Sequence, residues 1–275
     1  MSDSTNQRAV RRWHRALITG ASSGIGQAFA RRLAADGTDL VIVARREDRL
    51  RQLADELSSV ESTVSGVEVE ILVADLGNRS DVGLIVDRLA DNSRPVDLLV
   101  NNAGFGTVGD FIDQDVDVES MMIDVNVTAL NRLAHAAGSS MATRGRGGIL
   151  NVSSIAGFSP SPKSATYGAT KAFVTSFSEA LSIELGPQGV VVSCLCPGLT
   201  RTEFQEKADY RPSAMPQAFW QSAEEVAEAG LAGIEAGTAV IVPGAHNKMA
   251  RILAQAVPKG IVRRVAKRLA EANGK

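Results

Sequence analysis

The chain has 275 residues, of which 44% are hydrophobic and 22% are charged, and its formal net charge is −2. This composition is typical of globular proteins, excludes collagen-like and disordered classes, and gives no support for nucleic-acid binding. The first 15 residues lack the apolar core of a signal peptide, and no apolar run approaches the roughly 20 residues of a membrane span. We therefore expect a cytoplasmic protein.

The first informative stretch follows a polar, basic tail over residues 1–14, which we expect to be flexible. Residues 16–26 read ALITGASSGIG: an apolar run that suits a buried strand, and then Gly20, Gly24 and Gly26 before a helix expected over 24–36. Glycines allow a backbone to approach a ligand closely, and the start of a helix attracts anions. The stretch therefore predicts a phosphate-binding turn. The alternative is a plain turn between strand and helix, because the glycine spacing differs from the general dinucleotide fingerprint.

The next strand ends where a dinucleotide-binding fold selects its cofactor. Residues 40–44 are a continuous apolar run, typical of a parallel strand buried on both faces, and Arg45 and Arg46 follow it directly. An acid here binds a ribose 2′-hydroxyl, whereas an arginine accommodates the 2′-phosphate of NADP. We expect NADP(H), with Arg45 as the binding residue because it follows the strand immediately. The alternative is a solvated charge cluster, since Glu47 and Asp48 suit the first turn of the next helix.

Segments with strand-like and helix-like patterns alternate through the rest of the chain. Further strands are expected over residues 67–74, 97–101, 148–153, 190–195 and 239–242, and further helices over residues 81–89, 116–143, 164–185 and 223–235. Turns containing glycine follow two of these strands, as NNAGFG at 101–106 and Pro197-Gly198. This alternation predicts an α/β protein with a Rossmann-type doubly wound parallel sheet of about seven strands in a single domain.

Two residue pairs have side chains that share a face. Tyr167 and Lys171 lie four apart in an expected helix, and an adjacent ammonium should lower the pKa of the tyrosine from about 10 toward the operating pH. Such a tyrosine could be a general acid/base, and the alternative is a solvated surface pair.

Cys194 and Cys196 share one face of an expected strand, where we expect small core residues and no disulfide; the alternative is a reactive thiol. No metal site is predicted.

Six motifs, taken in order, resemble the short-chain dehydrogenase/reductase family over residues 15–244. They are TGASSGIG, NNAG, Asn126, Ser154, Tyr167-x-x-x-Lys171 and Pro197-Gly198. The resemblance implies that Tyr167 exchanges a proton with a substrate carbonyl or alcohol, and that Lys171 tunes Tyr167 and holds the nicotinamide ribose. It implies that Ser154, 13 residues before Tyr167, binds the substrate oxygen, and that Asn126 binds a water in the proton relay.

The resemblance also implies a site for NADP(H). Asp75 would contact the adenine, Asn101 the adenosine ribose and Thr202 the carboxamide end, while the first glycine turn would line the phosphates. The full expected set is Gly20, Ser22, Ser23, Gly24, Ile25, Gly26, Arg45, Asp75, Leu76, Asn101, Ala103, Gly104, Tyr167, Lys171, Pro197, Gly198 and Thr202. The resemblance further implies a small-molecule carbonyl or alcohol substrate and a homodimer or homotetramer.

Residues 199–222 depart from the alternation of strands and helices, and in the resembling family this region is a lid over the substrate. Apolar and aromatic residues are concentrated there, namely Phe204, Tyr210, Met215, Phe219 and Trp220. They favour a hydrophobic substrate. The alternative is that some of them attach the lid to the body of the protein.

The last segment, residues 245–275, is basic and amphipathic. After His246 it has eight Lys or Arg residues and one acid, interleaved with aliphatic residues and divided by Pro258. Three roles stay open: packing within the protein or its oligomer, contact with an anionic membrane surface, and binding of an acidic carrier.

These observations predict an oxidoreductase that transfers hydride between NADP(H) and a carbonyl or secondary alcohol of a hydrophobic substrate. One alternative is a reductase of 3-oxoacyl thioesters. A second is a non-catalytic NADP-binding sensor or scaffold, which the complete set of Ser154, Tyr167 and Lys171 argues against.

Overall fold

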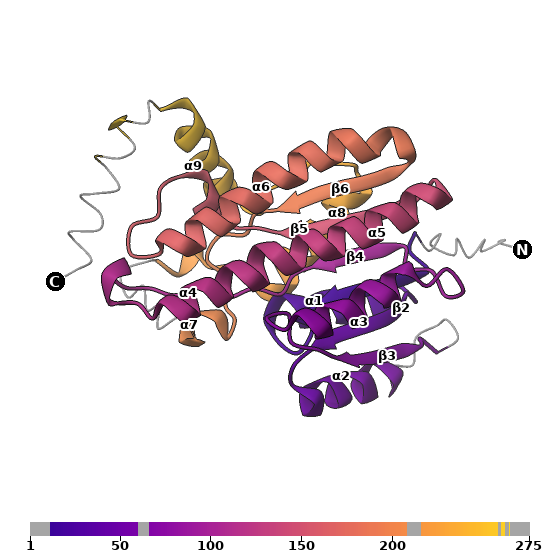
Figure 1. The fold of residues 1–275 in the computed structure, drawn as a ribbon. Helices are drawn as coiled ribbons and strands as arrows, with labels where there is room; N and C mark the ends of the chain where they lie inside the picture. Colours follow the sequence, from indigo (N-terminus) through magenta and orange to yellow (C-terminus); the bar gives the residue numbers. More distant parts are fainter. Residues whose placement is uncertain (1–11, 60–65, 208–215, 258–259, 262–263, 265–275) are drawn as a thin grey trace, which may run out of the picture.

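The computed structural model describes residues 12–59, 66–207, 216–257, 260–261 and 264. Its centre is a seven-stranded sheet in the order β3-β2-β1-β4-β5-β6-β7, and every neighbouring pair is parallel (Figure 1). The strands are β1 (Arg15–Thr19), β2 (Asp39–Ala44), β3 (Val69–Val73), β4 (Leu98–Asn101), β5 (Gly147–Val152), β6 (Val190–Leu195) and β7 (Val240–Ile241). The predicted doubly wound Rossmann-type sheet is confirmed.

The apolar runs of the strands fill a core on each side of the sheet. On β1, Leu17 packs into one core and Ile18 into the other, because successive side chains of a strand point to opposite faces. Both are fully buried, and Leu17 pairs in register with Val41 of β2 and Leu99 of β4. A central parallel strand therefore needs apolar residues at every position, which explains why these strands were recognisable in the sequence.

Helices cover both faces of the sheet (Figure 1). One face carries α1 (Gly24–Ala35), α2 (Glu47–Ser59) and α8 (Ala223–Glu235), and the other carries α3 (Arg79–Ala90), α5 (Leu130–Arg144) and α6 (Ala165–Leu185). The remaining elements are η1 (Phe111–Asp113), α4 (Val116–Ile123), η2 (Asp124–Ala129), η3 (Ile155–Phe158), η4 (Gly186–Gln188), α7 (Phe204–Lys207), η5 (Gln217–Phe219) and α9 (Ala245–Ala256). Among the described helices, none combines the length and hydropathy that a membrane crossing requires.

The helix expected over residues 116–143 is interrupted. It consists of α4, a π-helical segment η2 and then α5, and Asn126 lies in the π-helical segment. Such segments insert one residue into a helical turn and are frequent at functional sites. The apolar period of the sequence did not predict this interruption.

Part of the expected N-terminal tail is packed on the body. Trp13 is 6% exposed, and its carbonyl oxygen accepts a hydrogen bond from Thr38 Oγ1 at 2.9 Å. A Cβ atom at Gly148 would lie 2.6 Å from the Trp13 ring, so β5 has a glycine where the indole covers it. Residues 1–11 lie outside the described residues.

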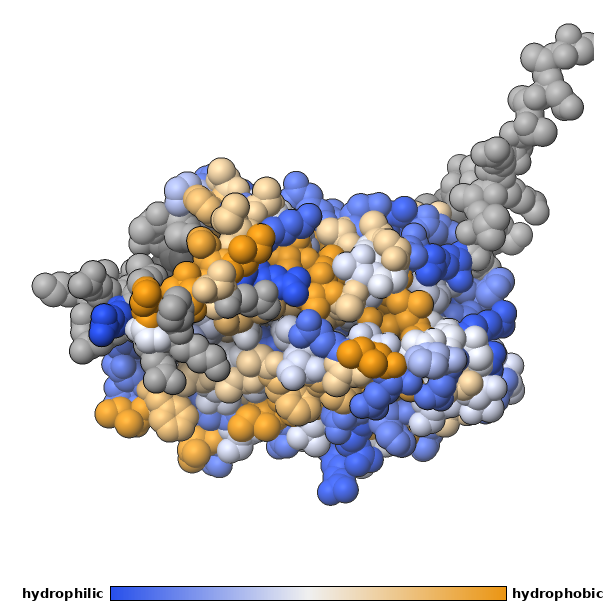
Figure 2. All heavy atoms as spheres, turned by 90° about the horizontal axis from the view of Figure 1, so that it is seen from above, coloured by the Kyte–Doolittle hydropathy of each residue, from blue (hydrophilic) through white to orange (hydrophobic). Residues whose placement is uncertain are grey.

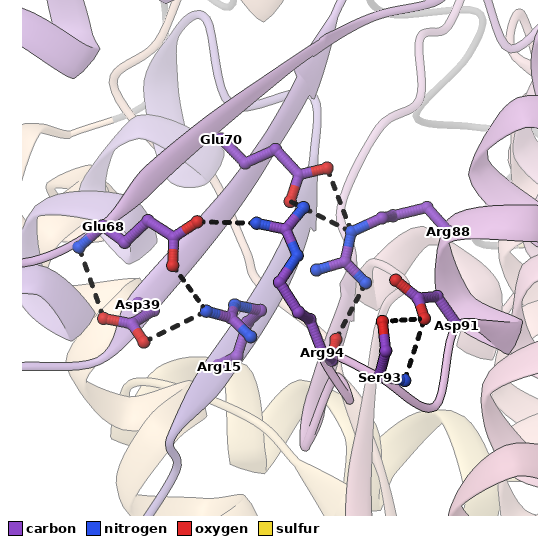
Figure 3. A network of polar contacts seen from close by, with 8 residues as sticks. All are labelled: Arg15, Asp39, Glu68, Glu70, Arg88, Asp91, Ser93 and Arg94. Atoms are coloured by element: carbon purple, nitrogen blue, oxygen red, sulfur yellow. Dashed lines mark hydrogen bonds and ion pairs between the residues drawn. The ribbon is translucent and has the colours of Figure 1, made fainter.

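The amino ends of the first three strands are joined by charged side chains (Figure 3). Arg15 donates to Glu68 at 2.8 Å and to Asp39 at 3.3 Å, and Arg94 donates to Glu68 at 2.7 Å. The nearly buried Arg88 side chain donates to both carboxylate oxygens of Glu70 at 3.0 Å. Since these strands are parallel, their other ends meet at the opposite edge of the sheet, where ligands of this fold bind.

Candidate active site

The first glycine turn is built for close backbone contacts. Gly20 and Gly24 have φ angles of +68° and +55°, which glycine adopts far more readily than other residues. A Cβ atom at Gly26 would lie 2.3 Å from the carbonyl oxygen of Gly20 and 2.5 Å from Asn102 Nδ2. The turn therefore has no room for a side chain at Gly26.

A second turn, after β4, is attached to this first one. Thr19 Oγ1 accepts hydrogen bonds at 3.0 Å from the backbone N–H groups of Asn102 and Ala103. Asn102 Nδ2 donates to the Thr19 carbonyl at 2.9 Å. Sequence reasoning did not select Thr19 or Asn102, although both lie within motifs that it used. The two turns form one surface at the point between β1 and β4 where the order of the strands reverses.

This surface fits the phosphates of a dinucleotide. Helix α1 starts beside the turn, and its N-cap residue Ser23 makes no side-chain hydrogen bond to the helix. The backbone N–H groups of a first helical turn lack partners within the helix and bind phosphate oxygens. Ser22 is 7% exposed, and Ile25 packs against the core beside it. The methyl group of Thr202 lies over Gly24, 3.0 Å from the position of an added Cβ.

Charged side chains stand at the ends of β2 and β3. Arg45 forms an exposed ion pair with Asp75, with 3.7 Å between Nη1 and Oδ2, and Leu76 packs against the neighbouring core. Arg46 Nη2 donates to Ser22 Oγ at 3.1 Å, which brings this arginine to the first glycine turn. The sequence favoured Arg45 because of its position in the chain, and the structure places both arginines at this edge.

Asn101 and the Pro197-Gly198 turn, which were predicted to contact the cofactor, form hydrogen bonds and close contacts with other residues of the protein. Asn101 is 2% exposed, and its Nδ2 donates to Asn151 Oδ1 at 2.9 Å within the core. The Pro197 carbonyl accepts from Ile155 N at 3.0 Å. At Gly198 a Cβ atom would lie 2.4 Å from Asn247 Oδ1. These bonds fix the backbone at the ends of β4 and β6.

The structure brings the expected catalytic side chains together. Ser154 caps η3 by accepting from Ala156 N at 3.1 Å, and its side chain hydrogen-bonds to that of Tyr167. The neighbouring Ser153 is buried and donates to the Lys171 carbonyl at 2.7 Å. Ser154 is therefore the serine that can meet a substrate oxygen at Tyr167.

The ionisation of Tyr167 differs from the expectation. Burial around its hydroxyl raises the pKa of Tyr167 to about 12, and the hydrogen bond with Ser154 acts in the opposite direction. The prediction that Lys171 lowers this pKa is wrong for this structure, because desolvation has the largest effect and, among the described residues, the only group that opposes it is Ser154. At neutral pH the tyrosine is protonated, which is the state that can donate a proton.

Lys171 is buried beneath the tyrosine. Its Nζ donates to the Val152 carbonyl at 3.0 Å and lies 5.7 Å from the centre of the Tyr167 ring. Burial lowers the pKa of Lys171 to about 8, and the thiols of Cys194 and Cys196 oppose this shift. Both thiols are buried and free, with 3.6 Å between the sulfur atoms, so they are core residues as predicted.

Asn126 joins the loop after β4 to α6. Its Nδ2 donates to the Phe105 carbonyl at 2.9 Å and to Thr170 Oγ1 at 3.1 Å, and its Oδ1 accepts from Phe105 N at 3.1 Å. Gly104 lies against Asn126 and Lys171, since an added Cβ would be 2.9 Å from Asn126 Oδ1 and 3.3 Å from Lys171 Nζ. Thr170 was not selected from the sequence. The side chain of Asn126 therefore positions the loop that passes over Tyr167 and Lys171.

The expected lid region is closed at its base. Thr200 bridges to Gln221, and Arg201 N donates to the Gln221 carbonyl at 2.9 Å. Its aromatic residues have two kinds of contact. The Phe204 ring lies 5.5 Å from the Tyr167 ring, where it could contact a substrate, whereas the Phe219 ring packs edge-on against His246 at 5.0 Å and attaches the lid to the body of the protein. Tyr210 and Met215 lie outside the described residues.

The described part of the C-terminal segment packs on this base. In α9, Asn247 is 3% exposed and donates to the Pro243 carbonyl at 2.7 Å and to Gln221 Oε1 at 3.2 Å. The Arg251 guanidinium lies 5.5 Å from the centre of the Phe158 ring. These contacts favour the first of the three roles, packing within the protein. The segment beyond Val257 falls mostly outside the described residues.

Comparisons with known proteins agree with this geometry. A family model described as short chain dehydrogenase matches residues 14–212. The chain is 41% identical over 191 residues to sulfoacetaldehyde reductase 2 of Chromohalobacter salexigens, covering 68% of this chain and 73% of the reductase.

Solved structures are similar over most of the chain. A short-chain dehydrogenase from Sphingobium yanoikuyae, in complex with NADPH, is 40% identical with a TM-score of 0.78, covering 84% of this chain and 88% of that one. The bulky-bulky ketone specific alcohol dehydrogenase from Comamonas testosteroni is 36% identical with a TM-score of 0.76, covering 88% of this chain and 91% of that one.

Proposed function

The chain belongs to the short-chain dehydrogenase family of oxidoreductases, and from this premise we propose that it transfers hydride between NADP(H) and the carbonyl or secondary alcohol of a hydrophobic substrate. The observation that carries the proposal is the meeting of Ser154, Tyr167 and Lys171 beside the glycine turns at one edge of the sheet. When bound, NADP(H) supplies or accepts the hydride.

The protein residues handle the proton. In reduction, Ser154 and Tyr167 would hydrogen-bond to the carbonyl oxygen, and the Tyr167 hydroxyl would donate its proton to that oxygen. With a pKa of about 12 the tyrosine holds this proton at neutral pH. Lys171, with a pKa lowered to about 8, is mostly cationic at pH 7 and would stabilise the phenolate that remains. In alcohol oxidation the same groups would move the proton in the opposite direction.

A hydrophobic substrate is supported by the surroundings of Tyr167. The Phe204 ring lies against the tyrosine, and both rings pack directly on Gly106, where an added Cβ would be 2.8 Å from the Tyr167 ring and 3.1 Å from the Phe204 ring. The name of the related Comamonas enzyme specifies bulky ketones. We propose that ketones or secondary alcohols with large apolar substituents fit this chain as well.

The preference for NADP(H) rests on the arginines after β2. We expect Arg45→Ala to weaken NADP⁺ binding by about tenfold, because it removes a charged contact to the 2′-phosphate, and to leave NAD⁺ binding within about twofold. Isothermal titration calorimetry measures both. Arg51→Ala is the matched control, since Arg51 lies on the helix that follows, α2, and its side chain is 69% exposed, as is that of Arg45. If Arg45→Ala weakens the binding of NADP⁺ and NAD⁺ equally, or weakens neither, Arg45 does not bind the 2′-phosphate.

We propose a homodimer or homotetramer whose interface includes α4 and α6. These helices pack against each other and expose large hydrophobic residues, namely Val116, Met121, Ile123, Phe173 and Ile183. Seen from above, hydrophobic residues gather on the left of the molecule, the side on which α9 lies in Figure 1 (Figure 2). Exposed apolar patches of this kind mark interaction surfaces.

Sedimentation velocity tests this interface. The wild type should sediment as a dimer or tetramer. Phe173→Glu combined with Ile183→Glu should shift it toward the monomer, because association would then bury a carboxylate at each of the two positions. Leu84→Glu, at a 53% exposed position on α3, is the control and should leave the assembly intact. A monomeric wild type would refute the proposal.

A further inference from the structure

A short segment at the start of the lid touches both halves of the site. Thr202 covers Gly24 of the first glycine turn, and Phe204 lies 5.5 Å from the ring of the catalytic Tyr167. Between them, the Glu203 side chain reaches across to the end of β2, which is 157 residues away in sequence at Arg46. One carboxylate therefore links the lid to the part of the site where cofactor selection takes place.

Among the described contacts of Glu203 are ion pairs with two arginines. Its Oε2 accepts from Arg46 Nη1 at 3.0 Å, and its Oε1 pairs with Arg49 Nη1, one turn further along α2. The other nitrogen of the same guanidinium, Arg46 Nη2, donates to Ser22 Oγ in the glycine turn. The Glu203 side chain is 30% exposed, so the pair is only partly screened by solvent. Arg46 thus holds the lid and the glycine turn at once.

Carboxylates and phosphates are alternative partners for a guanidinium. Both accept its fork of N–H donors, and two such anions side by side repel each other. In this fold arginine after the second strand accommodates the 2′-phosphate of NADP, and here both Arg45 and Arg46 follow β2, with Arg46 the one that reaches the glycine turn. A 2′-phosphate bound there would lie close to the Glu203 carboxylate and would compete with it for Arg46.

We propose that Glu203 is an internal competitor of the 2′-phosphate: it holds the start of the lid against the site through Arg46, and a 2′-phosphate displaces it. This inference rests on the proposed use of NADP(H). Because Phe204 is the next residue, displacement of Glu203 also releases the Phe204 ring from Tyr167. A ligand without a 2′-phosphate leaves Glu203 in place, so Glu203 couples the identity of the cofactor to access to the catalytic tyrosine.

Binding measurements with adenosine 2′,5′-bisphosphate test the competition. This probe differs from 5′-AMP only by the 2′-phosphate, and it has no nicotinamide that could contact the lid. We expect Glu203→Gln to bind the bisphosphate about fivefold more tightly than wild type, because a partly exposed ion pair of about 1 kcal/mol no longer has to break, and to bind 5′-AMP within about twofold. Glu228→Gln, which removes a carboxylate paired with Arg32, is the control and should match wild type.

Limited proteolysis tests the lid directly, because a change of charge alone would alter affinity but not cleavage. In wild type, the bisphosphate should accelerate tryptic cleavage after Lys207 at least about threefold, and 5′-AMP should not. Glu203→Gln should be cleaved rapidly without ligand and gain nothing from the bisphosphate. Unchanged cleavage, or protection of wild type by the bisphosphate, would overturn the inference.

The two proposals fail in different ways. If wild type binds the bisphosphate no more tightly than 5′-AMP, the proposed preference for NADP(H) is wrong, and the competition falls with it. If wild type prefers the bisphosphate but Glu203→Gln changes neither its affinity nor its cleavage, only the role of Glu203 is refuted.

Discussion

Replacing Tyr167 with phenylalanine should lower kcat by a factor of about 10² to 10⁴ and leave NADP(H) binding unchanged. The substitution removes the hydroxyl that we propose exchanges a proton with the substrate, while keeping the ring that packs against Phe204. The half-buried position should tolerate it, since the hydroxyl's hydrogen bond is to Ser154, which is itself partly exposed.

Steady-state rates and calorimetric cofactor affinities for the same preparations check this expectation. The chain has two tyrosines, and Tyr210→Phe is the matched control: it removes the same hydroxyl but keeps the apolar ring that the lid would offer a substrate, so turnover should stay within about threefold of wild type. If Tyr167→Phe retains near-normal turnover, Tyr167 is not the proton donor. If it loses cofactor affinity as well, its role is structural.

Replacing Gly26 with alanine should abolish measurable dinucleotide binding, by a factor of at least about 100. The new Cβ would lie 2.3 Å from the Gly20 carbonyl oxygen, and neither of these backbone atoms can rotate away. The glycine turn must move, and the phosphate-binding N–H groups move with it. We also expect the free energy of unfolding to fall by about 1–3 kcal/mol, as in other overpacked sites.

Calorimetric titration with NADP⁺ and denaturant-induced unfolding measure these two effects separately. Gly83→Ala is the control, because Gly83 lies in α3 and an added Cβ would meet no atom within 4 Å. There the change should raise stability by up to about 1 kcal/mol, since alanine is the better helix former, and should leave binding unchanged. Normal dinucleotide affinity in Gly26→Ala would show that the turn does not bind the phosphates.

Features that depend on local pattern were predictable from the sequence. The buried parallel strands are recognisable because residues such as Leu17 and Ile18 face two different cores and must both be apolar. The four-residue spacing of Tyr167 and Lys171 places them on one helix face, and the structure keeps them together with 5.7 Å between Nζ and the ring centre. In both cases the relevant geometry is set by a few adjacent residues.

Features that depend on packing across the fold were not predictable. The pKa of Tyr167 is set mainly by burial, which spacing does not reveal. The π-helical segment around Asn126 breaks a helix that the apolar period describes as continuous. Glu203 and Arg46 are 157 residues apart, and their contact exists only because the lid folds back over the end of β2.

The central claim, that this chain moves hydride between NADP(H) and a hydrophobic carbonyl or alcohol, is tested most directly by near-ultraviolet absorbance of NADPH mixed with a panel of bulky ketones. We predict loss of absorbance with at least one ketone, more slowly or not at all with NADH, and not with the Tyr167→Phe variant. If wild type binds NADPH but oxidises it with none of the panel, or with Tyr167→Phe equally well, the claim is contradicted and a non-catalytic role for the bound cofactor is favoured.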